Sequence, residues 1–448
     1  MLGPRLMVAG TSSGAGKTSV ATGLMAALRG RGLEVASAKV GPDFIDPGYH
    51  SLATGRPGRN LDAWMCGPDL MVPLAGRAGD GADVLVIEGV MGLFDGAADG
   101  TLSSTADIAG LLEAPVVLVV DCSSQAASVA ALVHGFATFD RRVGLAGVIL
   151  NKLASDSHEQ MVRAALASAP APVPVLGALH RDERLGWRDR HLGLVPVAER
   201  PEEVAASLTA LAEIMAEACD LDELLRIARS APPVDAAPVP MPGFIGAARI
   251  AVAGGKAFTF SYPDNVEALA AAGAEIVPFD PLVDEVLPPG LDALVIGGGF
   301  PEVMVEQLAA NHRLRLDVRT QIERGLVVWA ECGGLLWLAD SLDDHPMVGA
   351  VAGDARMTER LTLGYRTATQ TGDTPFGPTG TAFRGHEFHY TTFEPPGDAL
   401  SLTGRTGTHL GGHASPRLFA SYLHVHLAGR PDLAEAFVAT AIASRPVT

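Results

Sequence analysis

The chain has 448 residues with 51 acidic and 33 basic side chains, and its formal charge of −18 excludes a general nucleic-acid-coating role because it repels a phosphate backbone. Hydrophobic residues make up 48% of the chain and charged residues 19%, which excludes extended disorder and provides apolar side chains for packed cores. The length exceeds what one core usually supports, so we expect two domains.

The cysteines and the N-terminus indicate the cellular compartment. Cys66, Cys122, Cys219 and Cys332 are too few and too scattered for a disulfide framework, and none forms a close metal-binding pair. Residues 1–8 lack a basic region and a cleavage site, and no apolar stretch reaches membrane-spanning length. We therefore expect a soluble, cytoplasmic protein without a membrane partner, and the oligomeric state stays open to a homodimer.

The first half, residues 1–229, alternates short β-branched runs with longer segments rich in Ala and Leu. This alternation predicts an α/β domain with a mostly parallel sheet covered by helices, because parallel strands are joined by crossover helices and are apolar on both faces. The predicted strands are Leu6–Ala9, Glu34–Lys39, Val84–Glu88, Val116–Asp121, Gly147–Asn151 and Val173–Ala178.

A proline-rich stretch, Ser230–Pro242, interrupts this pattern and predicts a linker, which we place at residues 230–246. A second α/β domain follows at 247–448. Its predicted strands are Arg249–Ala253, Glu275–Phe279, Ala293–Ile296 and Leu326–Trp329, and its predicted helices are Val266–Ala272 and Arg313–Arg324.

A glycine-rich segment, GTSSGAGKTS, follows the first predicted strand and opens a helix-compatible run. Backbone amides and a helix N-terminus bind phosphate, the lysine can reach the β- and γ-phosphates, and the threonine can ligate Mg²⁺. The loop has five residues, not the usual four, before its Gly-Lys pair, a spacing that resembles the dethiobiotin-synthetase-like P-loop enzymes; the alternative is a chance glycine-rich turn. The candidate nucleotide-binding residues here are Gly14, Gly16, Lys17, Thr18 and Ser19.

Carboxylates follow other strands of the same domain. Glu88 ends its strand, Asp43 and Asp46 lie just past the strand that ends at Lys39, and Asp95 lies in the turn after Glu88. The carboxyl ends of parallel strands meet at one sheet edge, and Mg²⁺ prefers such hard oxygen ligands. For Asp46 and Asp95 a solvated loop residue is an equal alternative. Asn151, after a further strand, could contact the nucleotide base or occupy a simple turn.

In the second half, an apolar strand runs into Ala330-Glu-Cys332-Gly-Gly and a helical segment. A sharp strand-to-helix turn presents its central side chain, so Cys332 is a candidate nucleophile, and His424 offers an imidazole to take its proton. The alternative is a buried inert cysteine. Amides of Gly298, Gly299 and Gly333 could stabilise an oxyanion, or the glycine run could be a flexible loop.

Taken together, these segments resemble the cobyrinate or hydrogenobyrinate a,c-diamide synthase family of corrin biosynthesis over essentially the whole chain. The matching stretches are GTSSGAGKTSV from Gly10, KVGPDFIDPGYH from Lys39, VIEGVMGLFDG from Val86, RHLGLVP from Arg190, IGGGFPE from Ile296, WAECGGLLWL from Trp329, RGHEFHY from Arg384 and ASYLHVH from Ala420. The resemblance implies an ATP-dependent synthetase domain followed by a class I-type glutamine amidotransferase domain. Family members often carry an Arg-Asp pair where this chain has Gly254-Gly255, and we assign no role to that loop.

The resemblance also implies the roles of the candidate residues. Cys332 would attack glutamine, with His424 as general base and acid; many related amidotransferases have a glutamate where this chain has His426, so we expect a dyad. Thr18, Asp43 and Glu88 would hold Mg²⁺. Lys39, Asp43, Asp46 and Asp95 would surround the phosphoryl group and the acceptor carboxylate.

The expected partners are small molecules: ATP, glutamine and a tetrapyrrole polycarboxylate. The alternatives are diamidation of nickel-sirohydrochlorin, amidation of other corrin carboxylates, or a P-loop regulatory ATPase with a silent amidotransferase domain. A set of basic residues is also expected to form a positive cleft beside the nucleotide site. They are Lys17, Lys39, Arg56, Arg59, Arg181, Arg184, Arg188 and Arg190.

Overall fold

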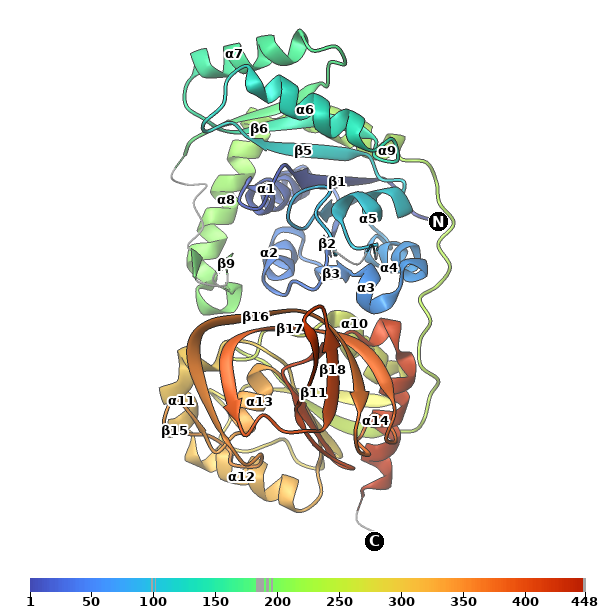
Figure 1. Cartoon of the computed structure of the whole chain (residues 1–448), viewed down its shortest axis with the longest axis vertical. Coiled ribbons are helices and arrows are strands. Elements are labelled where there is room, and N and C mark those ends of the chain that lie inside the picture. The colour runs from blue at the N-terminus through green and yellow to red at the C-terminus, as the bar shows by residue number, and fades with distance from the viewer. Residues whose placement is uncertain (98–99, 101, 183–188, 191–192, 195, 446–448) are drawn as a thin grey trace. The chain divides into compact units, whose positions relative to one another are not determined.

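A computed structural model describes residues 1–97, 100, 102–182, 189–190, 193–194 and 196–445 (Figure 1). The chain divides into two compact units, Met1–Val239 and Pro240–Thr448. The division lies inside the segment for which the sequence predicts a linker, residues 230–246.

Unit 1 contains a seven-stranded parallel sheet in the order β3-β2-β4-β1-β5-β6-β7. Its strands are β1 Arg5–Gly10, β2 Val35–Val40, β3 Arg59–Leu61, β4 Val84–Glu88, β5 Val116–Asp121, β6 Leu145–Leu153 and β7 Val175–His180. The short strands β8 Asp189–Arg190 and β9 Gly193–Leu194 pair separately. The predicted α/β class with a mostly parallel sheet is confirmed. Strand β1 is the middle strand of this order, and every residue in it is buried.

Helices connect these strands, as parallel order requires. They are α1 Lys17–Gly30, α2 Ile45–Thr54, α3 Ala63–Cys66, α4 Met71–Ala78, α5 Thr105–Leu111, α6 Ser128–Phe139, α7 Asp156–Ala167, α8 Pro201–Ala218 and α9 Leu221–Ser230, with 3-10 turns at Pro68–Leu70 and Val197–Glu199. On one face of the sheet, apolar side chains of β1, β4 and β5 pack against α1, α8 and α9. This packing fixes the ends of β1 and α1, between which the glycine-rich loop lies.

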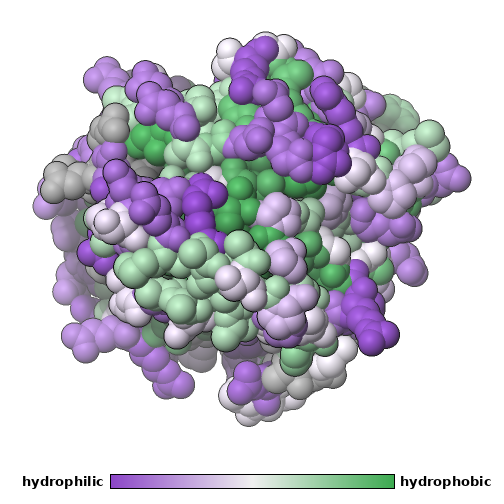
Figure 2. Space-filling view, turned by 90° about the horizontal axis from the view of Figure 1, so that it is seen from above, coloured by the Kyte–Doolittle hydropathy of each residue, from purple (hydrophilic) through white to green (hydrophobic). Residues whose placement is uncertain are grey.

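The surface of unit 1 also carries some apolar side chains. In the view from above, hydrophobic residues reach the surface between groups of hydrophilic ones (Figure 2). Phe139 of α6 and Met161 of α7 are exposed. Exposed apolar side chains are ordinary on protein surfaces. In the part of the chain that the structure describes, no helix is long and apolar enough to cross a membrane.

Unit 2 contains a six-stranded sheet in the order β11-β10-β12-β13-β21-β20, parallel except for its last pair. Its strands are β10 Ala248–Ala253, β11 Ala274–Phe279, β12 Ala293–Ile296, β13 Val327–Glu331, β20 His413–Ser415 and β21 Leu418–Ser421. One face packs against α11 Val305–Ala310, α12 His312–Glu323 and α13 Gly333–Leu338. The other packs against α10 Pro263–Ala271 and α14 Pro431–Ala443.

A second, mostly antiparallel sheet belongs to unit 2 and was not predicted. Its long strands β16 Asp354–Gln370 and β17 Ala382–Glu394 curve together in Figure 1. The remaining strands are β14 Ser341–Leu342, β15 His345–Pro346, β18 Leu400–Gly404, β19 Gly407–Gly411 and β22 His424–Val425. The 3-10 turns of unit 2 are Pro301–Met304 and Leu427–Gly429. Because β22 pairs with β17, this sheet places His424 opposite His386.

Candidate functional site

The glycine-rich loop joins the end of β1 to the first residue of α1. Gly14 and Gly16 have φ angles of 77° and 95°, which disfavour any residue with a Cβ atom. A Cβ atom at position 16 would also lie 2.1 Å from Nδ2 of Asn151. The Lys17 ammonium folds back over the loop and donates to the carbonyl of Ser12 at 3.0 Å. Ser19, in the first turn of α1, is half-buried.

Two consecutive residues near the carboxyl end of β6, which is separated from β1 by β5, hold this loop. Asn151 donates from Nδ2 to the carbonyl of Ala15 at 2.9 Å, and its Oδ1 accepts the amide of Lys152 at 2.9 Å. The Lys152 ammonium donates to the carbonyl of Gly14 at 2.8 Å and pairs with Asp121 at 2.7 Å. The side-chain amide of Asn151, which was expected to contact the nucleotide base, therefore supports the phosphate loop. The role of Lys152 was missed, although it adjoins a predicted residue.

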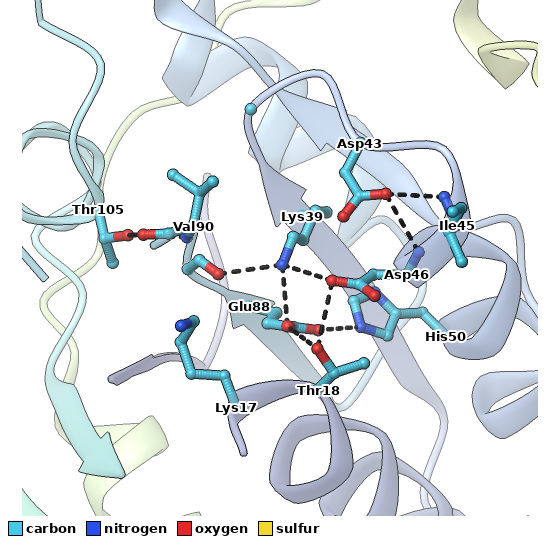
Figure 3. A network of polar contacts seen from close by, with 12 residues as sticks. Lys17, Thr18, Lys39, Asp43, Ile45, Asp46, His50, Glu88, Val90 and Thr105 are labelled. Carbon is cyan, nitrogen blue, oxygen red and sulfur yellow. Dashed lines mark hydrogen bonds and ion pairs between the residues drawn. The ribbon is translucent and has the colours of Figure 1, made fainter. Parts of the chain in front are cut away.

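A buried charge network lies at the carboxyl ends of β2 and β4 (Figure 3). Lys39 Nζ lies 2.7 Å from Oδ2 of Asp46 and 2.8 Å from Oε1 of Glu88. The Thr18 hydroxyl donates to the same Glu88 oxygen at 2.7 Å and lies 3.3 Å from Oδ2 of Asp46. Side-chain oxygens of Thr18, Asp46 and Glu88 thus converge on one point. The Lys39 ammonium lies against the two carboxylates at this point.

His50, which the sequence analysis missed, completes the surroundings of Glu88. It is fully buried, and its Nε2 lies 2.7 Å from Oε2 of Glu88. Burial would raise the pKa of Glu88, but Lys39 and His50 outweigh burial and hold it well below its ordinary value. Burial and the carboxylates of Asp43 and Glu88 raise the pKa of Asp46. These two neighbours therefore favour the charged form of Glu88.

Lys39 and Lys17 differ in their electrostatic surroundings. Burial disfavours the charge of Lys39, yet Asp46, Glu88 and Asp43 outweigh it and raise its pKa. For Lys17, burial and then the neighbouring charge of Lys39 lower the pKa to about 8. Lys39 is thus neutralised by protein carboxylates, whereas Lys17 has less local compensation for its charge.

The other predicted carboxylates lie at the margin of this network. Oδ1 of Asp43 accepts the amides of Ile45 and Asp46 at 2.7 and 3.3 Å, so it binds the start of α2. Asp95 is exposed and its Oδ2 accepts the amide of Gly92 at 2.9 Å. Of the two aspartates near β2, the structure therefore brings Asp46, and not Asp43, into contact with Thr18.

The predicted positive cleft is only partly assembled. Arg56 donates to the carbonyl of Asp80, which precedes β4, and so lies toward the amino ends of the strands, away from the loop. The expected position of Arg56 was wrong, because helix α2 carries the chain from the carboxyl edge to the amino edge of the sheet before this residue. Arg181 donates to the carbonyl of Ser123 at 3.1 Å, and Arg59 begins β3 beside β2. Arg184 and Arg188 lie outside the described residues, as does the side chain of Arg190.

Cys332 lies at the sharp turn between β13 and α13 of unit 2. Its φ of 45° and ψ of −102° are strained for a residue with a side chain, a feature that clusters at functional sites. The two glycines that follow Cys332 allow close packing at the turn, because a Cβ atom at Gly334 would lie 2.4 Å from the carbonyl oxygen of Ile296. Cys332 is buried, and its Sγ lies 3.9 Å from the carbonyl of Phe388.

His424 is buried beside this cysteine. Its Nδ1 lies 3.4 Å from Oε2 of Glu331, the residue that precedes Cys332. Burial would lower the pKa of His424, but its interactions with Cys332 and Glu331 outweigh burial and raise it to about 10. The structure therefore brings the predicted pair Cys332 and His424 together. Glu331 was missed, although it lies within the motif that identified the cysteine.

His426 contacts other residues of unit 2. Its Nδ1 accepts the amide of Ala428 at 3.3 Å, and its ring centre lies 4.5 Å from that of Tyr262. It thereby caps the turn Leu427–Gly429.

The amides expected to form an oxyanion site differ in availability. The Gly298 amide donates to the carbonyl of Phe260 at 3.1 Å, so it is already engaged. A Cβ atom at Gly333 would lie 3.0 Å from the amide nitrogen of Gly299, which places these two segments in close contact. Gly299 and Gly333 are therefore the better candidates for this role.

Comparison with known proteins supports both halves of this arrangement. Residues 6–194 match a family described as the CobQ/CobB/MinD/ParA nucleotide binding domain, and residues 249–432 match the CobB/CobQ-like glutamine amidotransferase domain. The chain is 50% identical to a hydrogenobyrinate a,c-diamide synthase of Streptomyces coelicolor, covering 97% of each chain. It is 47% identical to the protein of that name from Thermobifida fusca, covering 99% of this chain and 98% of the relative. It is 44% identical to a cobyrinate a,c-diamide synthase of Syntrophotalea carbinolica, covering 97% and 98%.

Proposed function

Because the chain belongs to the hydrogenobyrinate and cobyrinate a,c-diamide synthase family, we propose that it converts the a and c acetate side chains of such a macrocycle to amides. Glutamine supplies the nitrogen and ATP activates the carboxylates. The observation that carries this proposal is the presence in one chain of a phosphate loop beside buried carboxylates and of a strained cysteine beside a buried histidine.

In unit 2, the sulfur of Cys332 attacks the side-chain amide carbon of glutamine after its proton moves to His424. The amide C–N bond breaks, the nitrogen takes a proton from His424 and leaves as ammonia, and a γ-glutamyl thioester remains. Water then hydrolyses the thioester to glutamate and restores the thiol. Amides of Gly299 and Gly333 stabilise the oxyanion of each tetrahedral intermediate.

In unit 1, the loop amides and Lys17 bind the phosphates of ATP. The γ-phosphoryl group passes to an acetate carboxylate of the macrocycle, giving an acyl phosphate and ADP. Ammonia attacks the acyl carbon, the C–O bond to phosphate breaks, one ammonia proton passes to the departing phosphate, and the amide and inorganic phosphate are released. Two such rounds produce the a,c-diamide. Activation is required because a carboxylate is a poor electrophile.

Mg²⁺ fits the donor set of this site. Within the described ranges, no three His, Cys, Asp or Glu side chains alone could hold a metal ion. Mg²⁺ is usually bound by one or two carboxylates together with substrate phosphates and water, and Thr18, Asp46 and Glu88 present hard oxygens at one point. These residues would hold the ion, which would neutralise phosphate charge. Asp43 would help to position Asp46, because its carboxylate accepts the backbone amides of Ile45 and Asp46 at the start of α2.

Hydrogenobyrinate is our preferred acceptor, because the relatives of 50% and 47% identity carry that name and the cobyrinate relative is 44% identical. A reducing compartment such as the cytoplasm suits this reaction. Cys66, Cys122, Cys219 and Cys332 form no disulfide bond, and Cys332 must keep its thiol.

The test is incubation of the protein with ATP, Mg²⁺, glutamine and one tetrapyrrole, followed by mass spectrometry. We expect hydrogenobyrinate to gain two amides, with smaller yields from cobyrinate. Diamidation of nickel-sirohydrochlorin alone, amidation of other corrin carboxylates, or ATP hydrolysis without any amide would each refute the proposal.

A further inference from the structure

Glu331 is held in a fixed orientation inside unit 2. Its side chain is buried, and Oε1 accepts two hydrogen bonds, from the indole nitrogen of Trp329 at 3.1 Å and from the amide of Val425 at 2.9 Å. These donors come from β13 and β22, so both strands determine the rotamer of Glu331. The second oxygen, Oε2, is thereby directed at Nδ1 of His424, 3.4 Å away.

The strand that carries His424 is fixed in its turn. Asn265 donates from Nδ2 to the carbonyl of Val425 at 2.7 Å, and its Oδ1 accepts the amide of Leu427 at 2.7 Å. His426, which occupies the place where many related amidotransferases have a glutamate, is engaged with Ala428 and the ring of Tyr262. The carboxylate that faces the His424 imidazole is therefore that of Glu331, at the end of β13 and directly before Cys332.

We propose that Glu331 is the positioning residue of the glutaminase site: it accepts the Nδ1 proton of His424 and so keeps Nε2 available to take the proton of Cys332. This inference rests on the proposed function, because it concerns how the same cysteine is activated. In a neutral imidazole the hydrogen bond made by one nitrogen sets which nitrogen holds the proton. A carboxylate in this place also stabilises the imidazolium that forms when the thiol is deprotonated.

Other groups that face His424 leave this role to Glu331. His386, opposite it on β17, and His389 on the same strand are buried, and burial lowers their pKa values to about 3 and about 4. Both rings are therefore neutral near pH 7. Glu331 and Cys332 both interact directly with His424, and Glu331 is the one that forms no covalent bond with the substrate.

The test is Glu331→Gln, which preserves size and can still accept from Trp329 and Val425 but directs an amide N–H at Nδ1. That donor favours the tautomer with the proton on Nε2, which cannot accept the thiol proton. We expect glutaminase kcat to fall about 10²–10⁴-fold with little change in KM for glutamine. The pH profile of kcat should also change. The matched surface control is Glu323→Gln on α12, since Glu323 is an exposed carboxylate that pairs with Arg319.

A double-mutant cycle separates positioning from a structural role. If Glu331 acts through His424, Glu331→Gln should cause little further loss of residual activity or of Cys332 alkylation rate in a His424→Ala background. Equal losses in both backgrounds, or an unchanged kcat and pH profile in the single variant, would overturn the inference. Hydrogen exchange of β13 and β22 reports folding in each variant. A wild-type protein that did not hydrolyse glutamine would contradict the proposed function instead.

Discussion

Gly298 lies directly against the imidazole of His424, so that a Cβ atom at position 298 would come within 2.5 Å of Cε1 of the ring. The glycine is needed here for space. The sequence predicts that Gly298 supplies an oxyanion amide, but that amide donates to the carbonyl of Phe260. The glycine run therefore leaves space for the His424 ring, in addition to the oxyanion role proposed for the amide of Gly299.

We expect Gly298→Ala to displace His424 and to lower glutaminase kcat about 10²-fold, the effect of misplacing a catalytic group by roughly 1 Å. Ammonia-dependent amidation should be unchanged, because unit 1 is not altered. Gly254→Ala is the control, since its Cβ atom would meet its first neighbour, the carbonyl of Phe279, at 3.9 Å. Equal glutamine hydrolysis by the two variants would contradict the packing that we describe.

Cys332→Ala should abolish glutamine-dependent amidation and leave ammonia-dependent amidation intact, because only the first needs the thioester. Diamide yield with glutamine or with an ammonium salt, measured at the same ATP concentration, checks this. Cys122→Ala is a suitable control, since burial raises the pKa of that thiol to about 11 and makes it inert. Full glutamine use by Cys332→Ala would mean that another nucleophile serves unit 2.

Lys39→Met should destabilise unit 1 by about 3–5 kcal/mol, because removal of one partner from a buried charge network leaves the other charges uncompensated. Adding Glu88→Gln to the same protein should recover part of this loss, since it removes the anion left behind. Hydrogen exchange of β2 and β4 in the metal-free full-length chain measures both effects. Purely additive losses would show that the two side chains do not stabilise each other.

The pKa of His424, raised from 6.5 to about 10, makes part of the stability of unit 2 dependent on pH. A raised pKa stabilises the folded state fully below the unfolded value, and the contribution disappears as the pH rises through the folded value. The stability difference between wild type and His424→Gln should therefore shrink as the pH rises from 6.5 toward 10. Hydrogen exchange of β13, corrected for intrinsic rates, measures it, and a constant difference would show that His424 is neutral in the resting protein.

Local pattern predicted the parallel core of both units well. The predicted strand Val84–Glu88 is β4 itself, and Leu6–Ala9 lies within β1, because buried parallel strands are continuous apolar runs. The long strands β16 and β17 were missed because much of their length is polar or exposed, and their pairing depends on residues distant in sequence. The sequence motif also did not show which of its aspartates contacts Thr18: Asp46 does, whereas Asp43 accepts backbone amides of α2.

The same limit applies within the sites. Lys17, Thr18, Glu88, Cys332 and His424 could be named because each belongs to a short motif whose spacing implies a geometry. Glu331, His50 and Lys152 act on residues far from them in sequence or across strands, as with the 38 positions between His50 and Glu88. Such contacts become visible only when strand order is known.

The anchoring of the phosphate loop by Asn151 and Lys152 has a thermodynamic consequence. Their bonds to the carbonyls of Ala15 and Gly14 tie the loop to β6, more than 130 residues away along the chain. The entropy of ordering the loop is therefore lost when the protein folds and not when ATP arrives. Such preorganisation lets more of the contact energy with the phosphates appear as affinity for the nucleotide.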